Sequence, residues 1–303
     1  MTPAVWFDES GLAAIDPAAY ARLVHRLRAR VAVAASPELV AEDSPQRSRQ
    51  QQRVEAVAVV EVSGVITKRG SIWSELFGGC ALDHLSAQLA AARDDASVRA
   101  VLLHVDSPGG GVYGVDETAQ QIVALNKVKP VIAFTDGLAA SAAYWLASSA
   151  SRVVATRDAE LGSIGVYGLH FDTSGALAQA GIVPTLVKAG EFKGEANPYQ
   201  PLSDDDRAAM QARIDTHYMR FLTAVAKGRG KRVDVVREDF GRGRVVDAAT
   251  ALDVGMATDI GTAADALRIA IDEARLRSQK TTQQTRASDE LLRLRLQLED
   301  VAS

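Results

Sequence analysis

The sequence has few aromatic residues, a single cysteine and no long apolar run. Aromatic residues are 5% of the 303 residues although 47% are hydrophobic, so alanine and valine carry much of the core. The single cysteine, Cys80, excludes a framework of intrachain disulfides and is typical of a reducing compartment. No stretch approaches the roughly 18 apolar residues of a membrane-spanning helix. The apolar residues 31–35 are too few for the core of a signal peptide. We therefore expect a soluble, cytoplasmic protein with no membrane partner.

The charge balance and residue spacing exclude further classes. The formal net charge is −4, which gives no reason to expect a nucleic-acid partner. No spacing of His, Cys, Asp or Glu is typical of a metal site, and no Gly-Lys-Ser/Thr follows the glycine-rich segment. We expect neither a metal nor a cofactor.

The chain divides into three parts by composition. Residues 1–53 contain a predicted amphipathic basic helix (residues 17–30) and a polar linker, and residues 54–277 form the main domain. Residues 278–303 are a polar tail that is either helical or disordered. The spacing of its leucines does not decide, but its Leu, Arg, Gln and Glu residues are good helix formers and favour a helix.

The main domain alternates between short apolar runs and helix-length periodic segments. This pattern predicts an α/β fold with a largely parallel, buried sheet. The predicted strands cover residues 57–65, 100–105, 131–134 and 153–156, and the predicted helices cover residues 82–93, 116–126 and 141–149. A further helix begins after Ser203, whose hydroxyl is a good N-cap, and is expected to end at Gly228.

Ser141, Lys193 and a glycine-rich segment supply the parts needed for acyl transfer. Ser141 lies where a strand is expected to run into an Ala-rich helix, and Lys193 follows 52 residues later. The glycine segment, Ser107-Pro108-Gly109-Gly110-Gly111, allows backbone N–H groups to approach a substrate closely. A serine needs a base, and a lysine can serve when burial lowers its pKa.

Each residue also has a simpler interpretation. Ser141 could be a small residue that allows close packing, Lys193 an ordinary solvated lysine, and Lys188 is a rival for the base. No Gly-x-Ser-x-Gly motif surrounds Ser141, and the positions of His104 and His217 favour structural roles, so a Ser-His-Asp triad is unsupported.

Five segments in order resemble the signal peptide peptidase (protease IV) family of serine–lysine peptidases. They are the glycine segment, Ala140-Ser141-Ala142-Ala143-Tyr144-Trp145, Gly162-Ser163-Ile164-Gly165-Val166, Lys188-Ala189-Gly190-Glu191-Phe192-Lys193 and Pro201-Leu202-Ser203-Asp204. The chain is most similar to the phage branch of head-maturation proteases, of the minor capsid protein C type. Bacterial members commonly have Gly-Gly after the nucleophile, where this chain has Ala142-Ala143.

The resemblance implies a ClpP/crotonase-like fold of stacked βαβ units and a site of named residues. Ser141 is then the nucleophile, Lys193 the general base and Ser163 the residue that orients the lysine. The oxyanion hole uses Gly110 and Ala142. We expect the substrate groove to be lined by Gly109, Gly111, Val112 and Tyr113.

The resemblance further implies an endopeptidase that forms a homo-oligomeric ring, in which a neighbouring protomer could complete each site. Its substrates would be scaffold or capsid proteins in the host cytoplasm or the phage prohead. Three alternatives stay open: a soluble bacterial housekeeping peptidase, an acyl-CoA hydratase or isomerase on the same fold, and a capsid-associated structural protein without turnover.

Overall fold

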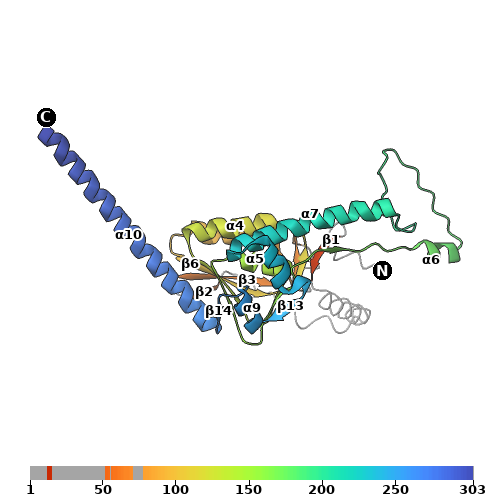
Figure 1. Cartoon of the computed structure of the whole chain (residues 1–303), viewed down its shortest axis with the longest axis horizontal. Coiled ribbons are helices and arrows are strands. Elements are labelled where there is room, and N and C mark those ends of the chain that lie inside the picture. Colours follow the sequence, from red (N-terminus) through yellow and green to blue (C-terminus); the bar gives the residue numbers. More distant parts are fainter. Residues whose placement is uncertain (1–11, 16–51, 55, 71–77, 303) are drawn as a thin grey trace, which may run out of the picture.

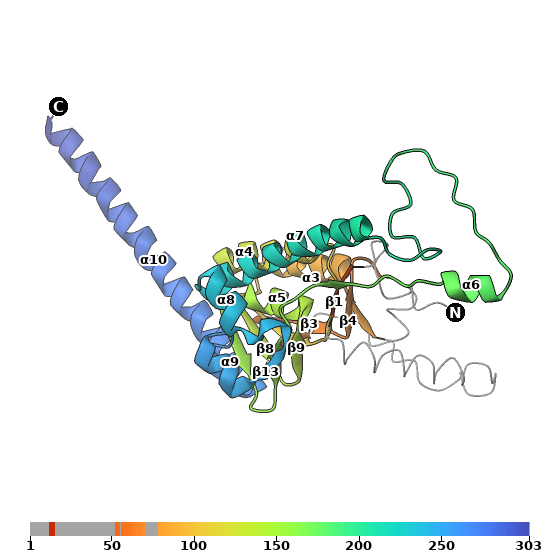
Figure 2. The same cartoon turned by 45° about the vertical axis from the view of Figure 1, so that its right-hand side comes forward.

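The computed structural model describes residues 12–15, 52–54, 56–70 and 78–302, and all structural statements below concern these residues (Figure 1). They form an α/β body from which two segments project, one around α6 (Ser174–Gln179) and one along the C-terminal part of α10 (Ala263–Ala302). Figure 2 shows both projections from a second direction.

The largest sheet has six strands, five of which run parallel. Its order is β14 (Asp259–Ile260), β10 (Arg152–Ala155), β8 (Val131–Thr135), β6 (Ala100–Asp106), β3 (Val57–Ser63) and β2 (Gln52–Val54). Only the edge strand β2 is antiparallel among them. The inner strands are nearly all Val, Ile, Leu and Ala, the composition of a sheet covered on both faces. The largely parallel α/β fold predicted from the sequence is confirmed.

Two smaller sheets continue from the carboxyl ends of these strands. One has the order β12 (Tyr167–Gly168), β1 (Leu12–Ile15), β7 (Gly109–Gly111), β4 (Val65–Thr67) and β5 (Gly79–Ala81). The other has the order β13 (Val245–Asp247), β11 (Glu160–Gly162) and β9 (Leu138–Ala140). The single strand predicted over residues 57–65 is in fact two. It breaks at Gly64, which has a φ of +73° and leaves no room for a Cβ atom, because that atom would lie 2.3 Å from the carbonyl oxygen of Gly78.

Helices cover both faces of the large sheet. The other helices are α3 (Leu82–Asp94), α4 (Val115–Val128), α5 (Ala142–Ser148), α7 (Asp204–Arg229), α8 (Val233–Asp239), the 3₁₀ turn η3 (Gly241–Gly243) and α9 (Ala248–Val254). The larger core cluster includes buried residues of α3, α4, α5 and α7, whereas α10 packs on the opposite face through Ala266 and Ala270. The centre of the sheet is thus buried between two helical layers, whereas Glu61, Ser63 and Asp106 near the carboxyl ends of β3 and β6 are exposed.

The long helix α7 begins where the sequence predicts and ends two residues later than expected. The Ser203 hydroxyl accepts a hydrogen bond from the Asp206 N–H at 3.1 Å, as an N-cap does. The helix runs through Gly228 and stops at Gly230, which adopts the left-handed conformation with φ 61°. Gly228 serves instead for close packing, since a Cβ there would lie 2.0 Å from the carbonyl oxygen of Ser148 in α5.

The C-terminal segment is helical, which is one of the two states expected for it. The boundary expected at residue 278 falls inside α10, which is one continuous helix (Figure 1). The helix expected over residues 17–30 lies outside the described residues. Strand β1 was not anticipated from the sequence.

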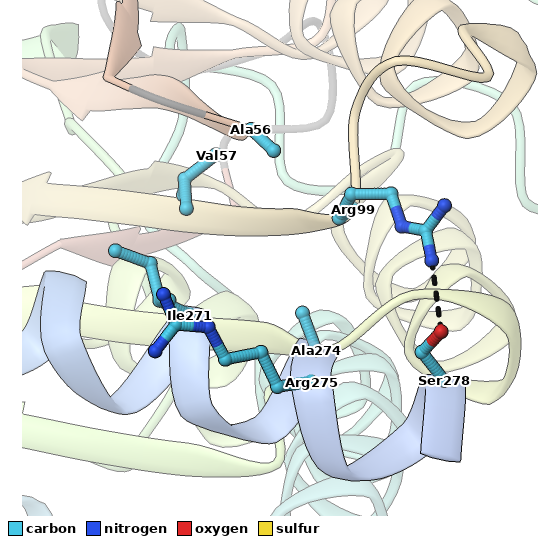
Figure 3. Close-up of a pocket in the computed structure, with 7 residues that line it drawn as sticks. All are labelled: Ala56, Val57, Arg99, Ile271, Ala274, Arg275 and Ser278. Carbon is cyan, nitrogen blue, oxygen red and sulfur yellow. Dashed lines mark hydrogen bonds between the residues drawn. The ribbon is translucent and has the colours of Figure 1, made fainter. Parts of the chain in front are cut away.

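A shallow pocket of about 260 Å³ lies beneath α10, where β3 and β6 begin (Figure 3). Ile271, Ala274 and Arg275 of the helix face Ala56 and Val57 across it, and Arg99 donates to the hydroxyl of Ser278 at 3.1 Å. The predicted site residues follow the carboxyl ends of the strands, so this pocket is at the other edge of the sheet.

Candidate active site

Ser141 occupies the sharp turn between β9 and α5. It is fully buried, and its φ of 55° and ψ of −124° are unusual for a residue with a side chain. Such a conformation costs on the order of 1–3 kcal/mol and persists only where the surroundings impose it. The Ser141 N–H donates to the carbonyl oxygen of Gly162 at 2.7 Å, and its carbonyl accepts from the N–H of Trp145 at 3.0 Å. Strand β11 and helix α5 therefore hold the strained turn in place.

The Ser141 hydroxyl has no hydrogen-bond partner. Among the described residues, its Oγ and the indole Nε1 of Trp145 are the only buried side-chain polar atoms in this condition. The hydroxyl does not cap α5 either, so it leaves the N–H groups of the first turn to another acceptor. Buried polar atoms are nearly always paired, and an exception points to strain or a catalytic role.

Ser163 directly follows β11, the strand that pairs with β9. Strands β9 and β11 run parallel with Ala140 opposite Gly162, so the two serines follow directly paired residues. Ser163 is buried, has a φ of 52°, and donates its N–H to the carbonyl oxygen of Arg244 at 2.8 Å. The structure therefore brings these two predicted residues together.

The glycine segment is tied to the same turn. The Ser107 N–H donates to the Leu138 carbonyl oxygen at 2.6 Å, and the Ala140 N–H donates to the Ser107 carbonyl oxygen at 3.1 Å. Gly110 then lies against β4 so closely that a Cβ would be 1.9 Å from the carbonyl oxygen of Ile66. Only glycine fits this position. Strand β7 also contacts α5, whose first helical residue is Ala142.

The remaining predicted groove residues differ in exposure. Val112 is buried in the core, so it could contribute to a groove only through its backbone. Tyr113 is 38% exposed, and its ring packs edge-on against His217 of α7, with 5.5 Å between ring centroids. Tyr113 is thus available to a ligand, whereas the Val112 side chain is not.

Lys193 is not next to Ser141 within one chain. It is exposed, and lies in the segment between α6 and α7 that projects from the body in both views, away from α5 (Figures 1 and 2). Its N–H donates to the Gly190 carbonyl oxygen at 3.2 Å. The rival Lys188 is also exposed, and its ammonium group donates to the Glu191 carbonyl oxygen at 2.8 Å. A single protomer thus presents Ser141 and Ser163 without either lysine.

His104 does not fill the vacant role of base. Its Nδ1 lies 3.0 Å from a carboxylate oxygen of Glu61, and its Nε2 lies 2.9 Å from Asp136, so both ring nitrogens are engaged. The hydrogen bond with Glu61, followed by that with Asp136, outweighs partial burial and raises the pKa of His104 to about 9. Neither carboxylate was predictable as a partner from local sequence, because Glu61 and Asp136 are 43 and 32 residues from His104. Glu61 lies opposite His104 only through the pairing of β3 with β6.

The described parts of the chain contain neither a membrane-spanning helix nor a cluster of metal-binding side chains. No helix there is long and apolar enough to cross a membrane. Within the same residues, no group of three or more His, Cys, Asp or Glu side chains could hold a metal ion.

Comparison with known proteins identifies the family. The model of peptidase family S49 matches residues 123–277, just over half of the chain and a range that contains Ser141, Ser163 and Lys193. The chain belongs to peptidase family S49. The resemblance noted in the sequence is thereby confirmed.

Relatives of this S49 member include proteins from phages and bacteria. The chain is 32% identical to "Capsid assembly protease C" of Escherichia phage lambda over 252 residues, which are 82% of this chain and 57% of the relative. It is 36% identical to "Head-tail preconnector protein GP5" of Enterobacteria phage P21, over 71% of this chain and 43% of the relative. It is 32% identical to "Putative signal peptide peptidase SppA" of Enterococcus faecium, over 70% of this chain and 61% of the relative. The S49 chain thus spans roughly half of the length of these relatives.

A solved structure of a ClpP1 point mutant from Listeria monocytogenes is also similar. The match covers 69% of this S49 chain and 94% of that one, with a TM-score of 0.42 and 16% sequence identity.

Proposed function

We propose that this chain is a serine endopeptidase in which Ser141 is the nucleophile and Lys193 the general base. The observation that carries the proposal is the Ser141 hydroxyl: it is buried, held in a strained turn and without a hydrogen-bond partner. Membership in a peptidase family supports peptide hydrolysis rather than acyl-CoA chemistry.

The proposed reaction follows the usual course of acyl transfer. Lys193 in its neutral form takes the proton of the Ser141 hydroxyl as the oxygen attacks the carbonyl carbon of the peptide. The N–H groups of Gly110 and Ala142 stabilise the negative oxygen of the tetrahedral intermediate. Lys193 then gives the proton to the leaving amine. In the second half of the reaction Lys193 takes a proton from a water molecule, which attacks the acyl carbon, and returns this proton to the oxygen of Ser141 as the acyl group leaves. Ser163 orients the lysine.

The lysine is proposed to come from a neighbouring copy of the chain. The projecting segment exposes large apolar side chains over residues 169–199: Leu169, Phe171, Ile182, Val183, Leu186, Val187, Phe192 and Tyr199. Val183 is 86% exposed and Val187 is 91% exposed, a pattern that favours burial against a partner. A homo-oligomeric ring in which each projecting segment covers the next protomer would bury these side chains and carry Lys193 to the partner's nucleophile.

Mixing two inactive variants tests this arrangement. Ser141→Ala and Lys193→Met are each expected to lose cleavage of an unfolded protein substrate. Rings assembled at random from equal amounts of the two variants should recover about a quarter of the wild-type rate. At about a quarter of the sites, the protomer with the intact serine is next to a protomer with the intact lysine. Lys188→Met is the matched control, since this lysine lies in the same exposed segment, and it should stay active.

Three results would contradict parts of the proposal. Activity in Lys193→Met would exclude Lys193 as the general base, and full activity in a monomer would exclude the need for a ring. If the mixed rings stay inactive while each variant assembles normally, the dyad does not form between protomers.

The biological role is proposed from the relatives. Two of them carry the names of a capsid assembly protease and a head-tail preconnector protein, which supports cleavage of scaffold or capsid proteins during phage head maturation. If coat and scaffold proteins are encoded beside this chain, co-expression with them should yield fragments that are absent with Ser141→Ala. The similarity to a putative bacterial signal peptide peptidase supports a housekeeping peptidase as the second candidate, which a gene neighbourhood without coat genes would favour.

A further inference from the structure

An N-terminal strand lies in the slot beside the glycine segment. Strand β1 runs antiparallel to β7, with Ala13 opposite Gly111, Ala14 opposite Gly110 and Ile15 opposite Gly109. On its other side β1 pairs antiparallel with β12, where Leu12 faces Gly168 and Ala13 faces Tyr167. In the described part of the chain, β7 and β12 belong to one sheet only because β1 joins them.

Both walls of this slot lead directly to the candidate active site. Strand β7 begins two residues after Ser107, which is hydrogen-bonded to Ala140 beside the nucleophile. Strand β12 begins four residues after Ser163. The slot is therefore one strand wide and is flanked by the segment with the proposed oxyanion donor Gly110 and by the segment that continues from Ser163.

The carboxyl end of β1 is directed toward the candidate active site. Its carboxyl end, Ile15, faces Gly109, the residue of β7 nearest to Ser107 and hence to the Ser141 turn. An extended peptide that adds to an exposed strand gains affinity from its main-chain hydrogen bonds, and its side chains set the specificity. The sequence of β1 is Leu-Ala-Ala-Ile, four uncharged residues with alanine at both central positions.

We propose that residues 12–15 are an intramolecular occupant of the peptide-binding slot, and that this slot accepts extended apolar segments with small central residues. The assignment of the slot to substrate rests on the proposed peptidase function. Its occupation by β1 rests on the strand pairing alone. A substrate then has to displace β1 before it reaches Ser141.

The test uses the full chain with Ser141→Ala, so that no peptide is cleaved. In this background, Ala13→Pro is compared with Ala13→Val. Ala13 is paired on both sides, so proline removes a backbone N–H that faces one of the two neighbours, whereas valine keeps it. The probe is a fluorescein-labelled peptide that contains Leu-Ala-Ala-Ile, and its binding is followed by fluorescence anisotropy.

We expect Ala13→Pro to bind the labelled peptide at least about tenfold more tightly than Ala13→Val, because the internal competitor is weakened. Equal affinities in two folded variants would overturn the proposal, as would a peptide that binds neither of them. Circular dichroism and thermal melting establish that both variants are folded.

A second measurement needs no substitution in β1. Saturating unlabelled peptide is added to the Ser141→Ala chain, and hydrogen exchange is followed. Exchange at residues 12–15 should accelerate, while β3 and β6 stay unchanged. Exchange at residues 12–15 that does not respond to bound peptide would show that the peptide lies elsewhere, against the proposal. Neither experiment involves turnover, so its outcome is independent of whether the wild type hydrolyses a peptide bond.

Discussion

The backbone N–H of Ser141 donates to the carbonyl oxygen of Gly162, the residue directly before Ser163, across 2.7 Å. This bond joins the turn of the proposed nucleophile to the strand of the proposed orienting residue. Both serines have positive φ values, 55° and 52°, so each turn holds a residue in a strained conformation. The hydrogen bond links these two strained turns to each other.

Removal of the Ser163 hydroxyl should lower activity without unfolding the protein. Ser163→Ala is expected to reduce kcat about ten- to a hundredfold with little change in KM, because the lysine loses an orienting group. The pH dependence of kcat should also change, which a purely structural serine would not cause. Ser163→Gly is the matched control: it lacks the same hydroxyl but relaxes the positive φ, so it should be as slow and more stable to heat. Wild-type kcat in both variants would exclude a role for this hydroxyl.

Gly110 should tolerate no side chain. A Cβ at this position would meet the carbonyl oxygen of Ile66 at 1.9 Å, so Gly110→Ala must push β7 away from β4 and shift the proposed oxyanion donor. We expect a loss of at least about a hundredfold in kcat, the scale of removing one such donor. Gly165→Ala is the control near the same site, since a Cβ there has its nearest neighbour at 3.9 Å. Similar rates for the two variants would contradict the role of Gly110.

The contact of α7 with α5 should be the most sensitive helix packing near the site. Gly228→Ala would place a methyl group 2.0 Å from the carbonyl oxygen of Ser148, and this clash is with backbone. We expect the free energy of unfolding to fall by about 2–4 kcal/mol, which denaturant titration can measure. Gly175→Ala in α6 has nothing within 4 Å and should change it by no more than about 1 kcal/mol. Equal effects would mean that α7 and α5 separate easily.

Arg229 adds to this helix contact. Two guanidinium nitrogens, Nε and Nη2, donate to the carbonyl oxygen of Ser148 at 3.2 and 3.1 Å, and Nη2 also donates to that of Ala150. Burial lowers the pKa of the arginine. The end of α5 is thereby capped by α7. Because Ser141 directly precedes α5, this contact fixes the far end of the helix that follows the proposed nucleophile.

The protonation of His104 should make stability depend on pH. Its folded-state pKa of about 9 lies above the ordinary value of 6.5, so the folded protein holds the proton more tightly than the unfolded chain. The stabilisation is therefore complete below about pH 6.5 and is lost as the pH rises through about 9. The melting temperature of the wild type should fall over this window, and that of His104→Gln should fall less. Identical pH profiles would show that the histidine is not held by Glu61 and Asp136.

The helices and strands of the body were largely predictable from local sequence. The apolar run of β6 and the N-cap Ser203 carry their own signals, and the turn at Ser141 follows from the small residues around it. Long-range relations were not visible. The close approach of Gly228 to Ser148, the pairing of Glu61 with His104 and the insertion of β1 beside β7 depend on segments far apart in the sequence.

The position of Lys193 illustrates the same limit. Its motif predicted a base near Ser141, but one chain leaves the lysine exposed on a projecting segment. A motif records which residues act together, and it carries no information on whether they come from the same protomer.

Strand β1 belongs to the same polypeptide as the slot that it fills, and this sets how its effect depends on dilution. A tethered segment competes at an effective concentration that is set within its own chain and does not depend on how much protein is present. The proposed assembly through the projecting segments depends instead on the local concentration of the chain. Concentrating the protein and its substrate in a small volume would therefore favour the proposed intermolecular site and raise the substrate concentration, while the effective concentration of β1 stays constant. Activity would then begin when the protein is confined with its substrate, and not as soon as the chain is synthesised.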